Sequence, residues 1–243
     1  MGRVSVFLFG VISYVAFLIA FLYAIGFVGN LVVPKSIDSG EPASTGPALI
    51  INALLLSLFA IQHSVMARQG FKKWWTKLVP RQAERSIFVL LASLLLLLLY
   101  WQWRPLTGVI WEIQSPTLQT ILRLLFWLGW GTVLLATFMV NHFDLFGLRQ
   151  VYLHLKGKEY TPVGFRKLAF YKFVRHPIML GFIIAFWATP RMTAGHLIFA
   201  FATTAYILIA LQLEERDMIT LHGEDYLQYR REVSMLVPIP KKK

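Results

Sequence analysis

The sequence predicts an all-α, polytopic integral membrane helical bundle with five to six membrane segments, the last two forming a helical hairpin with a cytosolic C-terminal tail. Of the 243 residues, 57% are hydrophobic and only 15% are charged. Uncharged runs cover residues 4–33, 86–103, 124–141 and 192–213. About 20 mainly apolar residues cross a bilayer as a helix, and in lipid only helices and closed barrels satisfy their own backbones. The sequence has no alternating short-strand pattern of a barrel, so helices are predicted.

The apolar segments follow one another along the whole chain. They cover residues 4–33, 48–67, 86–103, 121–141, 177–190 and 192–213. The first is too long for a secretory signal and lacks a small-residue cleavage site, so we expect a retained helix. The fifth reaches only about 21 Å at 1.5 Å per residue, and residues 189–195 should turn the chain tightly into the sixth. Residues 177–213 are therefore interpreted as one antiparallel hairpin.

The chain becomes polar from Glu214 onward, where we expect the sixth segment to end. Gly223 is a plausible residue to follow a helix C-terminus. Tyr226, Tyr229 and Arg230 then share one face of a short following helix.

Charge alternates between the loops. The 68–85 loop holds six basic residues against one acidic, and the 142–175 loop holds seven against two. The 34–47 and 104–117 loops have no basic excess. Under the positive-inside rule both termini and the two basic loops are cytoplasmic, which suits a bacterial inner membrane. The net charge of +12 is then explained by these loops and by contact with anionic membrane lipid, and no nucleic-acid partner is expected.

This topology brings titratable side chains to one cytoplasmic rim. His63 lies near the end of the second segment, His142 and Asp144 end the fourth, and Glu214 and Glu215 end the sixth. Ionisable groups at membrane depth are costly and are functional candidates by default. Each could also be a packing or solvated residue when taken alone. The chain has no cysteine, which excludes disulfides, thiolate metal sites and a cysteine nucleophile.

The start of the fifth segment predicts an anion site. Pro177 suits the first helical turn, whose unpaired N–H groups attract negative charge. Arg175 adds a fork of donors for a carboxylate, with His176 beside it. Gly181 makes room for a neighbouring helix or a ligand. Opposite, Glu214 and Glu215 could accept hydrogen bonds from a ribose diol or face a cation, and S-adenosylmethionine satisfies both sides.

These stretches resemble a known superfamily. "RHPIMLG" at 175–181, "EE" at 214–215 and "GEDYLQYRREV" at 223–233 are similar to the C-terminal cofactor region of the isoprenylcysteine carboxyl methyltransferases. The resemblance implies a membrane methyltransferase whose cofactor, S-adenosylmethionine, is bound by Arg175, His176, Pro177, Gly181, Glu214, Glu215 and Tyr226. Many carboxyl methyltransferases carry a tyrosine where this chain has Met179.

The rest of the chain narrows the resemblance. "IQHSVMARQGFKKWW" from residue 61 resembles the NnrU-like membrane proteins, and with "NHFDLFGLRQVYLHLKG" at 141–157 the whole chain resembles the methanethiol S-methyltransferase family. The implied reaction methylates a small thiol, methanethiol, to dimethyl sulfide. Residues 1–140 would form the NnrU-like transmembrane part, and 141–243 the cofactor-binding part.

A thiol acceptor requires a base, because a small alkyl thiol is mostly protonated at neutral pH. His142 is the first candidate, with Asp144 as its orienting partner, and His63 is the second. A regular helix would point residues 142 and 144 apart, so the pairing requires the helix to end there. The "HxD" spacing also suggests a metal site, but no third ligand is evident and none is predicted. A lipid or isoprenylcysteine acceptor, or a non-catalytic transporter or sensor, remain alternatives.

Overall fold

The computed structural model of the chain describes residues 2–41, 43–162, 164 and 168–239. Arg166 and Lys167, two of the basic residues in the 142–175 loop, lie outside this range. The chain forms two compact units. The first comprises residues up to Thr107 together with Asn141–Gly164, and the second comprises Gly108–Val140 and the chain beyond residue 164. The predicted division at residue 140 concerns function and stays a prediction.

The first unit is built around long helices. The long helices are α1 (Arg3–Gly29), α2 (Thr45–Ala67) and α4 (Arg81–Gln102). The unit also contains three short helices: α3 (Gln69–Trp75), which lies between α2 and α4 in the chain, α6 (His142–Leu145) and α7 (Leu148–Leu155). Helix α1 packs against α4 and α7, and α2 packs against α4. Asn30 ends α1 in the left-handed conformation, with φ of 50°, which asparagine tolerates better than most residues.

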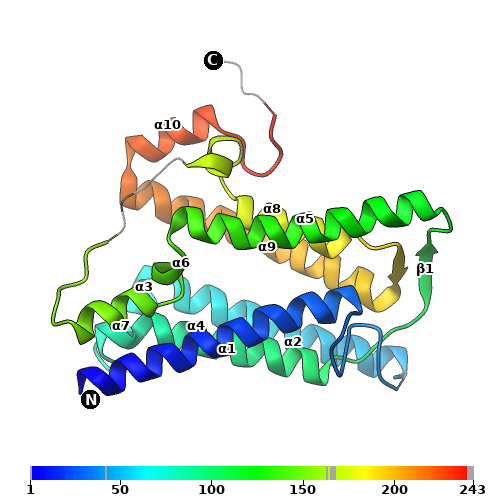
Figure 1. Cartoon of the computed structure of the whole chain (residues 1–243), viewed down its shortest axis with the longest axis horizontal. Coiled ribbons are helices and arrows are strands. Elements are labelled where there is room, and N and C mark those ends of the chain that lie inside the picture. The colour runs from blue at the N-terminus through cyan, green and yellow to red at the C-terminus, as the bar shows by residue number, and fades with distance from the viewer. Residues whose placement is uncertain (1, 42, 163, 165–167, 240–243) are drawn as a thin grey trace. The chain divides into compact units, whose positions relative to one another are not determined.

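The second unit contains α5 (Pro116–Val140), the 3-10 helix η1 (Ala169–Lys172), α8 (Pro177–Trp187), α9 (Ala194–His222) and α10 (Glu224–Glu232). Helix α8 lies against both α5 and α9, as Figure 1 shows. Proline begins both α5 and α8, where its missing N–H is not needed. The Thr193 side chain accepts a hydrogen bond from the His196 N–H and so caps the start of α9.

Within the described residues, five helices are long and apolar enough to span a membrane, namely α1, α2, α4, α5 and α9. The protein is therefore an integral membrane protein with a polytopic helical fold, as predicted. Helix α8 is shorter than its predicted segment and reaches about 17 Å at 1.5 Å per residue, against a hydrocarbon core of about 30 Å. It still forms a hairpin with α9.

The turn between α8 and α9 differs from the prediction. Instead of a simple turn, β2 (Arg191–Thr193) pairs antiparallel with β1 (Val109–Glu112). Ile113 donates to the carbonyl of Pro190, and Ala194 donates to that of Gly108. These bonds satisfy backbone groups that a helix does not use at this end of the hairpin.

The end of α9 confirms one prediction and corrects another. The helix does not end with the apolar segment at Glu214 but continues to His222, because a polar composition alone does not break a helix. Gly223, with φ of 55°, follows its last residue, as predicted. Conversely, α5 ends at Val140, before His142. Asn141 has an unusual φ of 153° and caps the separate helix α6 by accepting the N–H of Asp144.

Candidate active site

The start of α8 is fastened to the C-terminal segment by backbone hydrogen bonds. The N–H of Arg175 donates to the carbonyl of Ser234 over 2.9 Å, and that of His176 donates to Met235 over 3.2 Å. Val174 and Ser234 form a parallel bridge. The residues before α8 are therefore held extended, and Pro177 follows as the first helical residue.

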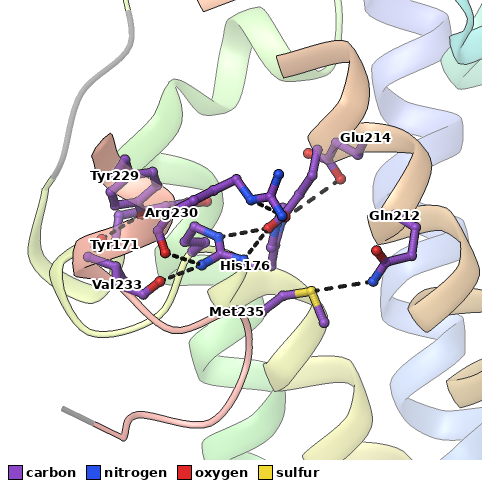
Figure 2. Close-up of polar contacts among 10 residues, drawn as sticks. Tyr171, His176, Gln212, Glu214, Tyr229, Arg230, Val233 and Met235 are labelled. Carbon is purple, nitrogen blue, oxygen red and sulfur yellow. Dashed lines mark hydrogen bonds and ion pairs between the residues drawn. The ribbon is translucent and has the colours of Figure 1, made fainter. Parts of the chain in front are cut away.

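Glu215 is the centre of a buried ionic cluster in this region. Figure 2 shows its partners His176 and Arg230 side by side. Its Oε1 lies 2.7 Å from Nε of Arg175 and 3.1 Å from Nε2 of His176. Its Oε2 lies 3.1 Å from Nε of Arg230. The side chains of Arg175 and Glu215 are only 6% and 5% exposed. Burying charges is tolerated when each is paired and hydrogen-bonded, and this carboxylate has partners on both oxygens.

The other groups of the Arg175 guanidinium also have partners. One terminal nitrogen lies 2.6 Å from Oε1 of Glu215, and the other donates to the carbonyls of Arg230 and Val233. The guanidinium thus joins α8, α9 and the tail. Two guanidinium groups, those of Arg175 and Arg230, contact the single carboxylate of Glu215.

Glu214 differs from its neighbour. Its side chain is 47% exposed, and its Oε2 lies 3.9 Å from Nδ1 of His176. Because adjacent residues on a helix point about 100° apart, Glu215 is buried while Glu214 remains near the edge of the cluster, where Figure 2 shows it joined to the cluster by a dashed line. Glu214 is therefore the carboxylate of the predicted pair that a ligand can reach.

Tyr226 and Tyr229 are buried on the inner face of α10. They pack with Val233 and with Met218 of α9, and the hydroxyl of Tyr229 donates to the carbonyl of Tyr171 over 2.6 Å. Burial raises the pKa of Tyr229 to about 12 and shifts the pKa of Tyr226 in the same direction. Both hydroxyls are neutral at physiological pH, and Tyr226 contributes to the core that supports the cluster.

Gly181 lies where α8 meets α5. A Cβ added at Gly181 would stand 2.7 Å from the carbonyl oxygen of Gly129 and 2.9 Å from the backbone nitrogen of Val133. Of the two neighbours that the sequence allowed, a helix or a ligand, the structure places a helix next to this glycine. The close approach holds the start of α8 in place.

The three remaining candidates belong to the first unit. His142 is 3% exposed, and its Nε2 lies 2.8 Å from the hydroxyl of Tyr14 in α1. Burial lowers the pKa of His142 below its ordinary value of 6.5, so the imidazole is neutral at physiological pH. His63 is half-buried in α2, with its ring against those of Phe59 and Phe88.

Asp144 was predicted to orient His142, but its carboxylate contacts other groups. It pairs with Arg149 over 3.0 Å and accepts a hydrogen bond from the Tyr160 hydroxyl over 3.1 Å. Arg149 also donates to the carbonyl and hydroxyl oxygens of Thr161. Asp144 therefore fastens the 160–161 segment to α7.

Sequence reasoning did not identify Tyr14 as a site residue. It stands 128 residues from His142 in an apolar run, where a tyrosine gives no periodic signal. Arg230 was placed on the face of the two tyrosines but was not assigned a role. Its position in "YRRE", among charged residues typical of a solvated helix, does not indicate a pairing with Glu215.

Comparison with known proteins shows the family of the chain. The family model described as NnrU protein matches residues 51–216. The chain is 60% identical to a methanethiol S-methyltransferase of Mycobacterium tuberculosis over 240 residues, covering 99% of this chain and 98% of the relative. It is also similar to methanethiol S-methyltransferases 1 and 2 of Bradyrhizobium diazoefficiens, at 59% and 56% identity, covering 96% and 98% of this chain and 81% and 91% of those relatives. No solved structure matches the chain. The chain belongs to the NnrU family and, within it, to the methanethiol S-methyltransferases, a family of membrane enzymes that transfer methyl groups.

Proposed function

We propose that this protein transfers a methyl group from S-adenosylmethionine to methanethiol and so forms dimethyl sulfide. The observation that carries the proposal is the identity of 60% with a protein named methanethiol S-methyltransferase over 99% of the chain. This coverage includes the Arg175–Glu215 cluster as well as His142.

The chemistry of the cluster suits this donor. S-adenosylmethionine combines a carboxylate, a ribose diol and a methyl group on a positively charged sulfur. A guanidinium binds a carboxylate through charge-assisted hydrogen bonds, and the cluster holds two guanidinium groups, those of Arg175 and Arg230. Because the Arg175 guanidinium is held by Glu215 and two carbonyls, the 41% exposed Arg230 is the residue assigned to contact that carboxylate. Glu214 is assigned to the ribose hydroxyls or to the positive charge of the donor.

The other predicted residues support these contacts. His176 and Glu215 orient Arg175 and Arg230, Pro177 begins the helix, and Gly181 and Tyr226 hold the surrounding elements together. In this proposal residues 141–243 carry the cofactor-binding part and residues 1–140 the NnrU-like transmembrane part. The protein lies in the inner membrane of a bacterial cell, with both termini and the donor site on the cytoplasmic side.

His142 is assigned as the base that accepts the thiol proton. Its lowered pKa keeps the imidazole unprotonated and able to accept a proton at neutral pH. The surrounding aromatic side chains exclude water, and in a medium of low polarity a thiolate attacks a sulfonium readily because opposite charges are neutralised. Asp144 and His63 are less direct candidates, since Asp144 is bound to Arg149 and Tyr160.

The proposal is tested with membranes that contain the protein, methyl-labelled S-adenosylmethionine and a panel of acceptors. Methanethiol, an isoprenylcysteine and phospholipid vesicles are supplied separately. We expect label in volatile dimethyl sulfide with methanethiol and none in the other acceptors. Label that enters lipid or a carboxylate ester instead would assign a different acceptor, and a purified protein that does not bind the donor would refute the enzyme assignment.

A further inference from the structure

The short helix α3 has two different faces. Helical hydrogen bonds continue beyond its last residue, since the N–H groups of Leu78 and Val79 donate to the carbonyl of Trp75 over 2.9 and 3.1 Å. Residues 69–79 therefore form one helical stretch. Because successive residues turn by about 100°, Phe71, Trp75 and Val79 share one side, the inner face. The opposite side, the outer face, holds Lys73, Trp74, Lys77 and Leu78.

The inner face is packed against the membrane helices of the first unit. Phe71 and Trp75 lie against a buried cluster of Met66, Phe88 and Val89. Met66 belongs to α2, and the other two belong to α4. Both helices are long and apolar enough to span the membrane, and α3 connects the end of the first to the start of the second. The helix α3 therefore lies at the membrane surface.

The outer face is open and carries both apolar and basic groups. Trp74 is 52% exposed and Leu78 is 65% exposed. Lys73 and Lys77 are also exposed, and neither has a hydrogen bond or an ion pair with any of the described residues. The Trp74 ring lies 5.4 and 5.8 Å, between centroids, from the two aromatic rings of the inner face. These contacts hold one side of the indole and leave the other open.

A membrane interface satisfies each of these groups. Tryptophan favours the level of the lipid headgroups, exposed apolar side chains on a surface helix reach the acyl chains, and lysine attracts anionic headgroups. The positive-inside rule explains basic residues in this loop, but it does not explain a tryptophan and a leucine exposed between two lysines on the same face. A large exposed apolar group of this kind marks an interaction site.

We propose that the outer face of α3 is a binding site for anionic phospholipid of the adjacent leaflet. Trp74 and Leu78 enter the upper part of the acyl chains, and Lys73 and Lys77 contact the headgroups. The site prefers lipids of net negative charge to zwitterionic ones, because only the former carry a charge that the lysines neutralise. This inference goes beyond the proposed function and does not depend on it.

A single fluorophore on the outer face tests the proposal. The chain has no cysteine, and a Cβ at Gly70, on the same side of the helix, would meet nothing within 4 Å. Gly70→Cys therefore carries a nitrobenzoxadiazole label without replacing a proposed contact. The full chain is reconstituted in phosphatidylcholine vesicles that contain equal fractions of brominated phosphatidylglycerol or brominated phosphatidylcholine. Bromine quenches the fluorophore on contact, so quenching measures which lipid occupies the site.

We expect brominated phosphatidylglycerol to quench more strongly, with an apparent association about 5-fold higher per lysine, and the preference to decrease with added salt. Lys73→Gln with Lys77→Gln should abolish this preference. The matched control is Lys156→Gln with Lys158→Gln, which removes two exposed charges from the other basic loop of the same unit and should retain it. Trp74→Ala should weaken quenching by both lipids, because the outer face loses its anchor.

Three results would overturn the inference. Equal quenching by the two lipids in the wild type would show contact without selection of the headgroup. Equal losses of preference in the two double variants would show that only the total charge matters. Unchanged quenching in Trp74→Ala would remove the anchor. None of these readouts involves methyl transfer, so each result is independent of the proposed function.

Discussion

At the scale of single residues, the two adjacent glutamates lie in different environments. Glu215 is buried and binds Arg175, His176 and Arg230, whereas Glu214 is 47% exposed. A sequence shows "EE" and the identity of its neighbours, but not which carboxylate faces inward, because this depends on where α9 lies against α8 and α10. The prediction that both glutamates bind the donor followed from their place opposite Arg175 in the hairpin and from the superfamily resemblance.

Glu215→Gln should therefore destabilise the protein while Glu214→Gln should not. Loss of one partner from a buried ion pair costs about 3–5 kcal/mol, whereas an exposed pair contributes about 0–1 kcal/mol. Thermal unfolding in detergent measures the difference, and equilibrium binding of S-adenosylmethionine should show weaker affinity for Glu214→Gln at nearly unchanged Tm. Equal losses of Tm in the two variants would contradict the separation of roles.

His142 should make stability depend on pH. Its folded-state pKa is lowered by burial from 6.5, so between that lowered value and 6.5 the unfolded chain binds a proton that the folded protein does not. Stability from this group is thus complete above 6.5 and is lost as pH falls toward the lowered value. Unfolding free energies from about pH 5 to about pH 8, the range in which histidine titrates, should fall less on acidification in His142→Gln than in the wild type. Parallel curves would show that His142 does not contribute.

At the scale of elements, composition and charge predicted the long helices well, because a helix that spans a bilayer is recognised by the length of its apolar run. The end of α9 could be predicted from Gly223 but not from the loss of apolar residues at Glu214, which the helix passes. The pairing of β1 with β2 could not be predicted, because it joins segments distant in the chain through backbone hydrogen bonds that composition does not encode.

The contact between α5 and α8 depends on glycine at position 181. In Gly181→Ala the new Cβ would collide with backbone atoms of Gly129 and Val133, which cannot move aside as a side chain can, and overpacking of this kind costs about 1–3 kcal/mol. Gly131→Ala in the same pair of helices is the control, because its Cβ would meet nothing within 4 Å. Thermal unfolding should show a lower Tm for Gly181→Ala alone. A Gly181→Ala protein as stable as Gly131→Ala would mean that the helices are not packed this closely.

At the scale of the whole molecule, the charges of the loops predict the orientation in the membrane, and the absence of cysteine from the sequence makes this prediction easy to test. Glu112→Cys and Glu159→Cys place single thiols in exposed positions of a non-basic and a basic loop. An impermeant maleimide should label Glu112→Cys in intact spheroplasts and Glu159→Cys only in inverted vesicles. The reverse pattern would invert the topology and place the donor site outside the cytoplasm.

The central claim is that the chain moves a methyl group to methanethiol with His142 as the base. The most direct measurement supplies purified protein with unlabelled methanethiol and trideuteromethyl S-adenosylmethionine and follows the mass of dimethyl sulfide in the headspace. The account predicts dimethyl sulfide with one deuterated methyl group from the wild type, and a loss of about 100-fold or more in rate in His142→Gln with donor binding retained. Dimethyl sulfide without deuterium, or an equal rate from His142→Gln, would contradict it.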